Sequence, residues 1–212
     1  MATVNSLLEL ARRQLGVKED PPGSNKVKYN AWYYGREVSG AAYPWCMVFV
    51  QWVFDRASVK LPTRTASCGA LMRAAQAAGC WVTKGYRPGD VVIYDFPGGA
   101  ATDHCGIVEA VDDSRVSAIE GNTSDASDAD GGAVERRTRR LSLIAGAVRP
   151  TFDEEVEEVR YNTVAECPDW ARETVQKLIN KGYLGGDGQS LDLSHDMVRI
   201  LVIQDRAGSF DQ

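Results

Sequence analysis

Cys46 is the residue of this chain whose type and position best suit nucleophilic chemistry. It lies in the stretch YPWCMVFVQWVF, two residues after Pro44, where an apolar helix is expected to begin. A thiol attacks only as a thiolate, and the unpaired N–H groups and positive dipole end of a helix N-terminus lower a thiol pKa. The alternative is a small buried cysteine that fills core space, which is the commoner role. A base near Cys46 would favour catalysis.

Candidates for that base and its partners follow later in the chain. His104 opens the stretch HCGIVEAV, and Glu120 and Asn122 close the stretch RVSAIEGN. If the two stretches form a hairpin about residues 112–115, both polar residues come within about two residues of His104, on one face unless a strand bulges. His104 could then deprotonate Cys46 and later protonate a leaving amine, while Glu120 or Asn122 fixes the imidazole tautomer. The pattern predicts amide hydrolysis through a thioester, although a structural or merely exposed histidine is the alternative.

Neither a metal ion nor another cofactor is expected. The odd number of cysteines and their wide spacing fit neither a zinc site nor a disulfide framework, so free thiols are predicted. The two histidines, His104 and His195, are far apart. The loop DASDADGG lacks the glycine spacing of an EF-hand, which favours a solvated turn. The five cysteines are Cys46, Cys68, Cys80, Cys105 and Cys167.

Aromatic residues close to Cys46 are candidates for binding a substrate. Trp45, Tyr43 and Trp32 could line a groove for a glycan or a peptide. Residues of this kind serve the core at least as often. The assignment is therefore a hypothesis that burial can test.

The elements that would position these residues are helices first and strands afterwards. Helical spacing predicts one helix over residues 5–15, a buried one starting beside Pro44 and a third over 67–79, with the polar segment EDPPGSNKVKYN between the first two. From Arg87 onward, five short strand-like stretches alternate with turn residues such as PGG, DDS and DADGG. This order predicts an α+β domain in which N-terminal helices pack on one face of a curled antiparallel meander.

Charge divides the chain into two parts. The net charge is −5 overall, and residues 1–150 hold 18 Lys and Arg against 16 Asp and Glu, while residues 151–212 hold 6 against 13. We predict a catalytic domain over 1–150, an acidic linker over 151–159 and a small helical module over 160–212. An acidic chain of this kind is not expected to bind nucleic acid.

The hydropathy pattern excludes insertion into a membrane. No run of 18 apolar residues occurs, and the strongest stretch, Met47 to Phe54, is interrupted by Gln51. The N-terminus carries no positive charge before its apolar positions and includes Glu9, so an amphipathic helix is expected there instead of a secretion signal. Synthesis in the cytoplasm without a signal peptide is the expectation.

Four stretches of this chain occur in the order in which a known family has them: YPWCMVFVQWVF, RPGDVVIYDF, DHCGIVEAV and IEGNTS. Over about residues 3–150 the chain thereby resembles the cysteine, histidine-dependent amidohydrolase/peptidase (CHAP) domain. The resemblance implies a papain-like layout with Cys46 as nucleophile, His104 as base, Glu120 as orienting residue and Asn122 as a further polar member. It implies hydrolysis of peptidoglycan, either between muramic acid and L-alanine or within the stem and cross-bridge peptides. The segment before Cys46 lacks the aspartate-rich calcium loop of many members, so no calcium is expected.

The tail resembles the C-terminal modules of phage and prophage lysins, which implies wall binding or oligomerisation, including a possible homodimer through this module. Trp170, Val175, Leu178 and Ile179 would share one helical face there. The layout suggests an endolysin made in the cytoplasm that reaches the wall after release by a holin-type protein. The alternatives are a host wall-remodelling hydrolase, a non-catalytic wall-binding or scaffold protein, and a cytosolic cysteine protease.

Overall fold

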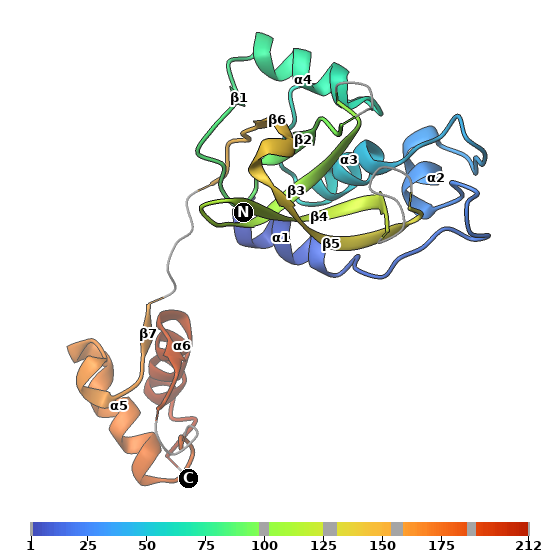
Figure 1. Ribbon diagram of the computed structural model, residues 1–212. Helices are drawn as coiled ribbons and strands as arrows, with labels where there is room; N and C mark the ends of the chain where they lie inside the picture. Colours follow the sequence, from blue (N-terminus) through green and yellow to red (C-terminus); the bar gives the residue numbers. More distant parts are fainter. Residues whose placement is uncertain (1, 98–101, 125–130, 154–158, 186–189, 212) are drawn as a thin grey trace. The chain divides into compact units, whose positions relative to one another are not determined.

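The computed structural model describes residues 2–97, 102–124, 131–153, 159–185 and 190–211 (Figure 1). The chain divides into two compact units, Met1–Glu155 and Val156–Gln212. The acidic linker predicted over 151–159 falls largely on residues 154–158, which lie outside the described residues. The loop DASDADGG and the turn PGG are likewise mostly outside them.

Four helices belong to the first unit. They are α1 (Val4–Arg12), α2 (Lys28–Tyr34), α3 (Cys46–Arg56) and α4 (Cys68–Ala77). Thr3 and Ser6 form a capping box at the start of α1, and the Ser67 hydroxyl accepts a hydrogen bond from the N–H of Ala70 at the start of α4. Helices α1, α3 and α4 therefore begin close to where the sequence predicts them.

Helix α2 lies partly in the segment predicted to be a polar connection. It forms because Tyr29 is fully buried and its ring packs against Trp45 and Phe49, with ring centroids 5.6 and 5.2 Å apart. Gly35, in the left-handed conformation at φ 69°, ends the helix. Tertiary contacts outweigh the weak local helix preference of this segment.

A six-stranded antiparallel sheet forms the other layer of the first unit. Its order is β1-β6-β2-β3-β4-β5, which confirms the predicted α+β class. Strands β2 to β5 follow each other as a meander, but the last strand returns to pair with β2 instead of extending the meander past β5. The 3₁₀ turn Leu141–Leu143 separates β5 from that returning strand. The strands are β1 (Trp81–Val82), β2 (Val91–Tyr94), β3 (His104–Val111), β4 (Arg115–Thr123), β5 (Ala133–Arg140) and β6 (Ile144–Val148).

The main core lies between the helices and one face of this sheet. Helix α3 is buried along most of its length and packs on β3 and β4 (Figure 1). Gly121 permits this approach, because a Cβ at this position would lie 2.6 Å from Phe49 Cβ and 2.9 Å from Trp45 Cζ3. The close packing of α3 against β4 brings Cys46 to the sheet.

The second unit is small and mainly helical. Strands β7 (Arg160–Tyr161) and β8 (Leu193–Ser194) pair, and α5 (Asp169–Asn180) packs with α6 (His195–Arg206); the 3₁₀ turn Val164–Glu166 precedes α5. Val175 and Leu178 are buried, whereas Trp170 is 44% exposed. The predicted helical face therefore serves mainly as the core of this unit. In the part of the chain that the structure describes, helices are too short or too polar to cross a membrane.

Candidate active site

Cys46 is the first residue of α3, as the sequence predicts. Its N-cap, Trp45, offers no side-chain cap, so the first-turn N–H groups are not satisfied by a capping side chain. Cys46 is 7% exposed. The thiol thus lies at the positive end of a buried helix, in a residue that keeps a small exposed surface.

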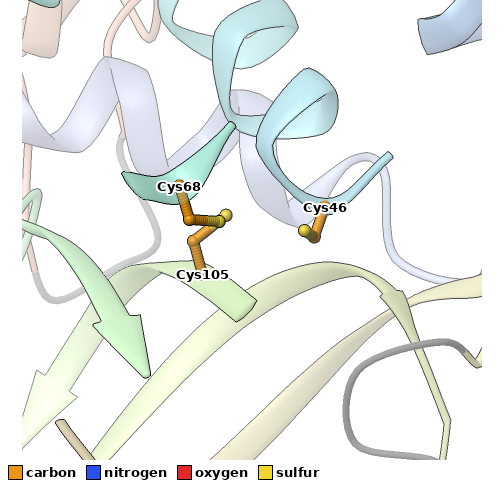
Figure 2. Close-up of side chains that lie close together, drawn as sticks. All are labelled: Cys46, Cys68 and Cys105. Carbon is orange, nitrogen blue, oxygen red and sulfur yellow. The ribbon is translucent and has the colours of Figure 1, made fainter. Parts of the chain in front are cut away.

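Two further thiols lie beside Cys46. Cys68 is the first residue of α4, Cys105 is the second residue of β3, and the three Sγ atoms lie within 4.8 Å of one another (Figure 2). Hydrogen bonds from Cys105 and Cys68 are the largest effects that lower the pKa of Cys46, and His104 lowers it further against the opposing effect of burial. For Cys68, a hydrogen bond with Cys105 lowers the pKa, but the contact with Cys46 and burial outweigh it and raise the pKa. Burial and the contacts with Cys46 and Cys68 raise the pKa of Cys105. Cys46 is therefore the most acidic thiol of the cluster.

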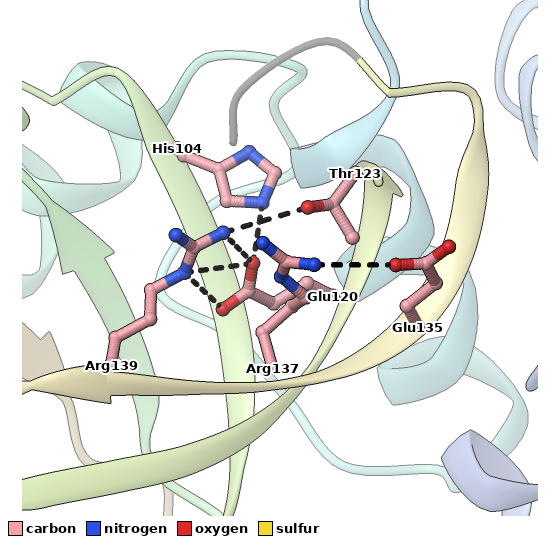
Figure 3. Close-up of polar contacts among 6 residues, drawn as sticks. All are labelled: His104, Glu120, Thr123, Glu135, Arg137 and Arg139. Atoms are coloured by element: carbon pink, nitrogen blue, oxygen red, sulfur yellow. Dashed lines mark hydrogen bonds and ion pairs between the residues drawn. The ribbon is translucent and has the colours of Figure 1, made fainter. Parts of the chain in front are cut away.

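His104 is held by Glu120, and Glu120 is held by Arg139. The imidazole Nε2 lies 3.0 Å from Glu120 Oε2, and Arg139 donates from Nε to Oε1 at 2.8 Å and from Nη2 to Oε2 at 2.7 Å (Figure 3). His104 and Glu120 are fully buried, and Arg139 is 6% exposed. Such buried, charge-assisted hydrogen bonds fix the orientation of the imidazole ring.

The path of the Glu120 side chain depends on a glycine. A Cβ on Gly106 would lie 2.7 Å from Glu120 Cγ and 3.1 Å from Ala118 Cβ. The absence of a side chain at position 106 therefore leaves room for Glu120 to cross β3 and reach His104.

Aromatic rings surround the charged groups. Tyr94 and Phe96 stack with His104 at centroid distances of 6.1 and 6.3 Å, and the Arg139 guanidinium lies 5.1 and 4.8 Å from the same two rings. Cation–π contacts of this kind stabilise a desolvated arginine. The rings keep water from the His104–Glu120–Arg139 chain.

The pKa values of His104 and Glu120 follow from these contacts. Burial works against the imidazolium, but hydrogen bonds and charges from Cys46 and Glu120 outweigh it and raise the pKa of His104 to about 9. Burial likewise opposes ionisation of Glu120, and the hydrogen bonds from Arg139 and His104 outweigh it, so the pKa of that carboxyl is lowered. Together with the lowered pKa of Cys46, these shifts favour a thiolate, an imidazolium and a carboxylate in the site.

The remaining imidazole nitrogen, Nδ1, is the one left to serve Cys46. Within the described residues it is buried and has no hydrogen-bond partner, while Cys46 lies close enough to raise the pKa of His104. Long contacts between a nucleophile and its base are common before substrate binds.

Asn122 lies beside this chain without joining it. It is fully buried in the left-handed region at φ 58°, where β4 is irregular between Glu120 and Thr123. Neither side-chain polar atom of Asn122 has a hydrogen-bond partner among the described residues. The structure thus pairs His104 with Glu120 and leaves the Asn122 amide buried and unsatisfied, which costs stability and invites a functional explanation.

The three candidate substrate-binding aromatics differ in burial. Trp45 is fully buried, and its indole N–H donates to Glu19 Oε1 at 2.8 Å; its side chain belongs to the core, so we do not propose it as a substrate contact. Tyr43 is half-buried and lies edge-on to Tyr34, and Trp32 is half-buried under the guanidinium of Arg64. Tyr43 and Trp32 keep surface that a ligand could contact.

Sequence reasoning missed Arg139, Cys68 and Cys105. Arg139 lies in the stretch ERRTRR, and the alternation that places Glu135, Arg137 and Arg139 on one face of β5 is the signal that the sequence offers. Cys68 and Cys105 are 37 positions apart, and nothing in their spacing indicates that they meet.

The arrangement is suited to attack on a carbonyl carbon. It supplies a thiolate, an imidazolium that can protonate a leaving group, and a carboxylate that holds the imidazole. Besides the three-thiol cluster, no group of three or more cysteine, histidine, aspartate or glutamate side chains within the described ranges is arranged to hold a metal ion.

Residues 38–122 match the family model of the CHAP domain. The matched range contains Cys46, His104, Glu120 and Asn122 and confirms the resemblance over part of the predicted range of 3–150. No curated protein matches the chain.

Several solved structures are similar to part of this chain. Ly7917 is 20% identical with a TM-score of 0.43, covering 70% of this chain and 62% of its own. The wild-type endolysin LysIME-EF1 is 18% identical with a TM-score of 0.41, covering 72% and 66%. A protein similar to lipoprotein, of the NLP/P60 family from Staphylococcus aureus subsp. aureus Mu50, is 16% identical with a TM-score of 0.36, covering 71% and 42%. This chain spans less than two thirds of the length of each, and similarity this distant carries no inference about activity.

Proposed function

We propose that this chain, which contains a CHAP domain over residues 38–122, is a peptidoglycan hydrolase that cleaves an amide bond with Cys46 as nucleophile. The observation that carries the proposal is the position of Cys46 at the N-terminus of the buried helix α3, with a fully buried His104 whose Nε2 lies 3.0 Å from Glu120 Oε2. The lowered pKa of Cys46 and the raised pKa of His104 favour the thiolate and imidazolium that cysteine hydrolysis requires.

The first half of the reaction forms a thioester. The Cys46 sulfur attacks the carbonyl carbon, and the first-turn N–H groups of α3 are placed to donate to the oxyanion that develops. When the C–N bond breaks, His104 gives its proton to the departing amine. The second half reverses these roles, because His104 takes a proton from water, which attacks the thioester and releases the carboxylic acid and the Cys46 thiolate.

Glu120 is our proposed orienting residue, and Arg139 is a positioning residue that acts through it. The 3.0 Å contact between Glu120 and His104 supports the first role, and the paired hydrogen bonds from Arg139 support the second. We propose that Asn122, whose amide is buried and unsatisfied among the described residues, contributes its polar atoms to substrate or to the oxyanion.

The bond cut is either the N-acetylmuramoyl–L-alanine amide or a peptide bond of the stem or cross-bridge. Mass spectrometry of fragments released from purified peptidoglycan separates these, since a new N-terminal alanine and a new cross-bridge amine identify different cleavages. Tyr43 and Trp32 are the aromatic residues that we propose for contact with the polymer.

Replacing Cys46 or His104 tests the proposal. Cys46→Ala and His104→Ala should abolish both the released fragments and the loss of turbidity of purified walls, while circular dichroism shows unchanged folding. Cys80→Ala, which alters a thiol outside the cluster, is the matched control and should retain turnover. Wild-type turnover in the Cys46 variant would favour a non-catalytic wall-binding or scaffold protein and would end the proposal.

For the second unit we propose wall binding or formation of a homodimer. Met197, Ile200 and Ile203 of α6 are 46, 55 and 66% exposed and share one helical face, which supports a binding role of some kind. The proposed domain layout remains a catalytic part over 1–150, a linker over 151–159 and a module over 160–212. Action at the cell wall, after release from the cytoplasm by a holin-type protein, is the localisation that goes with an endolysin.

A further inference from the structure

The three-thiol cluster has a second chemical capability beside nucleophilic attack. Cys46, Cys68 and Cys105 come from α3, α4 and β3, and their Sγ atoms lie within 4.8 Å of one another. Zinc binds cysteine sulfur at about 2.3 Å, so two sulfurs on one tetrahedral ion stand about 3.8 Å apart. Side-chain rotation alone can close a difference of about 1 Å.

Burial and local electrostatics favour a cation at this point. The three cysteines are 7, 6 and 0% exposed, and each is a free thiol. Cys46 and Cys68 are both first residues of helices of 11 and 10 residues, so the positive ends of two helices lie beside the cluster and offset part of the cost of ionising these two thiols when a cation binds. Soft thiolate ligands in a dry site select zinc or copper(I) over calcium and magnesium.

We propose that Cys46, Cys68 and Cys105 form a binding site for a single thiophilic metal ion, with Zn²⁺ as the ion expected. Zinc–sulfur bonds replace S–H bonds at the protonated cysteines, the protons pass to solvent, and no electron is transferred. Three protein ligands leave the fourth tetrahedral position open to water. The spacing of cysteines 46, 68 and 105 predicts no metal site, because the fold alone brings them together.

Occupation of this site would remove the nucleophile from catalysis, a consequence that rests on the proposed function. A sulfur whose lone pair is bound to Zn²⁺ cannot attack a carbonyl carbon. Hydrolysis of walls should therefore be inhibited by about one equivalent of Zn²⁺ and restored by a chelator. Metal binding itself does not depend on whether the chain is a hydrolase.

Cobalt(II) provides a readout that is independent of activity. The reduced full-length protein, titrated with Co²⁺ alone, should show sulfur-to-cobalt charge-transfer absorption that saturates at one ion per chain and disappears on addition of Zn²⁺. Cys68→Ser and Cys105→Ser should each weaken binding by more than about tenfold, since loss of even an outer-shell partner costs about 10–100-fold. Cys80→Ser should leave the absorption unchanged.

Three results would overturn the proposal. The first is wild-type protein with all thiols titrating as free and no charge-transfer absorption. The second is absorption that persists in Cys68→Ser, which would place the ion elsewhere. The third is a protein that has lost two thiols and two hydrogens by mass, because the cluster would then form a disulfide. If circular dichroism shows that Cys105→Ser does not fold, the result for Cys68→Ser decides whether the cluster binds the metal.

An active enzyme that binds no metal refutes this proposal alone, whereas metal binding without hydrolysis refutes only the proposed function.

Discussion

Replacing Arg139 by methionine tests whether the chain Arg139–Glu120–His104 orients the base. Methionine keeps an unbranched apolar stem against Tyr94 and Phe96 but removes the guanidinium that donates to both oxygens of Glu120. Glu120 is fully buried, so its carboxylate would keep the contact with His104 but lose the hydrogen bonds from Arg139. Removing one partner of a buried ion pair costs about 3–5 kcal/mol.

The variant should also change the chemistry of the site. Arg139 is the strongest influence that lowers the pKa of Glu120, so that pKa should rise in Arg139→Met. Protonation of Glu120 removes the charge that helps to raise the pKa of His104. The alkaline limb of the pH–rate profile, which reflects loss of the imidazolium proton, should therefore move to lower pH together with a fall in kcat.

Urea unfolding and a pH–rate profile measure the two effects. Arg136→Met is the matched control, because Arg136 lies on the same strand and pairs at the surface with Glu109, with its side chain 49% exposed; it should cost about 0–1 kcal/mol and leave the pH profile unchanged. Arg139→Met combined with Glu120→Gln should recover part of the lost stability but no activity. An Arg139→Met protein within about 1 kcal/mol of wild type, with an unshifted alkaline limb, would refute the reasoning.

Three other predictions concern the same site. Gly106→Ala places a methyl group where the Glu120 side chain now passes. Overpacking should cost roughly 1–3 kcal/mol of stability in urea unfolding, and displacement of Glu120 should lower kcat in the wall-turbidity assay. Wild-type activity in this variant would contradict the crossing path. In metal-free protein, activity should rise as Cys46 ionises, at a pH well below the usual range of a thiol, and fall as His104 loses its proton near about pH 9. NMR titration of Cys46→Ala should give a lower His104 pKa, and an unchanged value would show that the two groups do not interact. Gly121→Ala should push α3 from the sheet and cost about 1–3 kcal/mol, with a thermal shift assay as the check and an unchanged melting temperature as the contrary result.

The sequence predicts the fold class and most helices and strands because the local signals agree with the tertiary contacts. Short apolar stretches bounded by turn residues indicate β3 and β4, and the longer apolar run after Cys46, beginning beside Pro44, indicates a buried helix. It does not predict α2, which depends on Tyr29 packing against α3, or the return of β6 to β2. Both features depend on long-range contacts that no local sequence pattern specifies.

Residue types and strand alternation identify Cys46, His104, Glu120 and Asn122 as candidates, but they cannot rank Glu120 against Asn122. Extending the printed β3–β4 pairing of Ile107 with Ile119 would set Asn122 opposite His104, whereas the contact that forms is with Glu120. Glu120 reaches His104 because Gly106, which has no side chain, leaves room for it.

Activation of the Cys46 nucleophile is likewise a property of the fold. The effects that lower the pKa of Cys46 come from Cys105 and His104 on β3 and from Cys68 on α4, residues that lie 22 to 59 positions away in the sequence. Any shift of α3 relative to the sheet changes all of these contacts together, because they converge on one sulfur. Substitutions at the α3–β4 contact should therefore reduce reactivity of the thiol toward an alkylating agent before they unfold the domain, whereas substitutions confined to exposed positions of α3 should not.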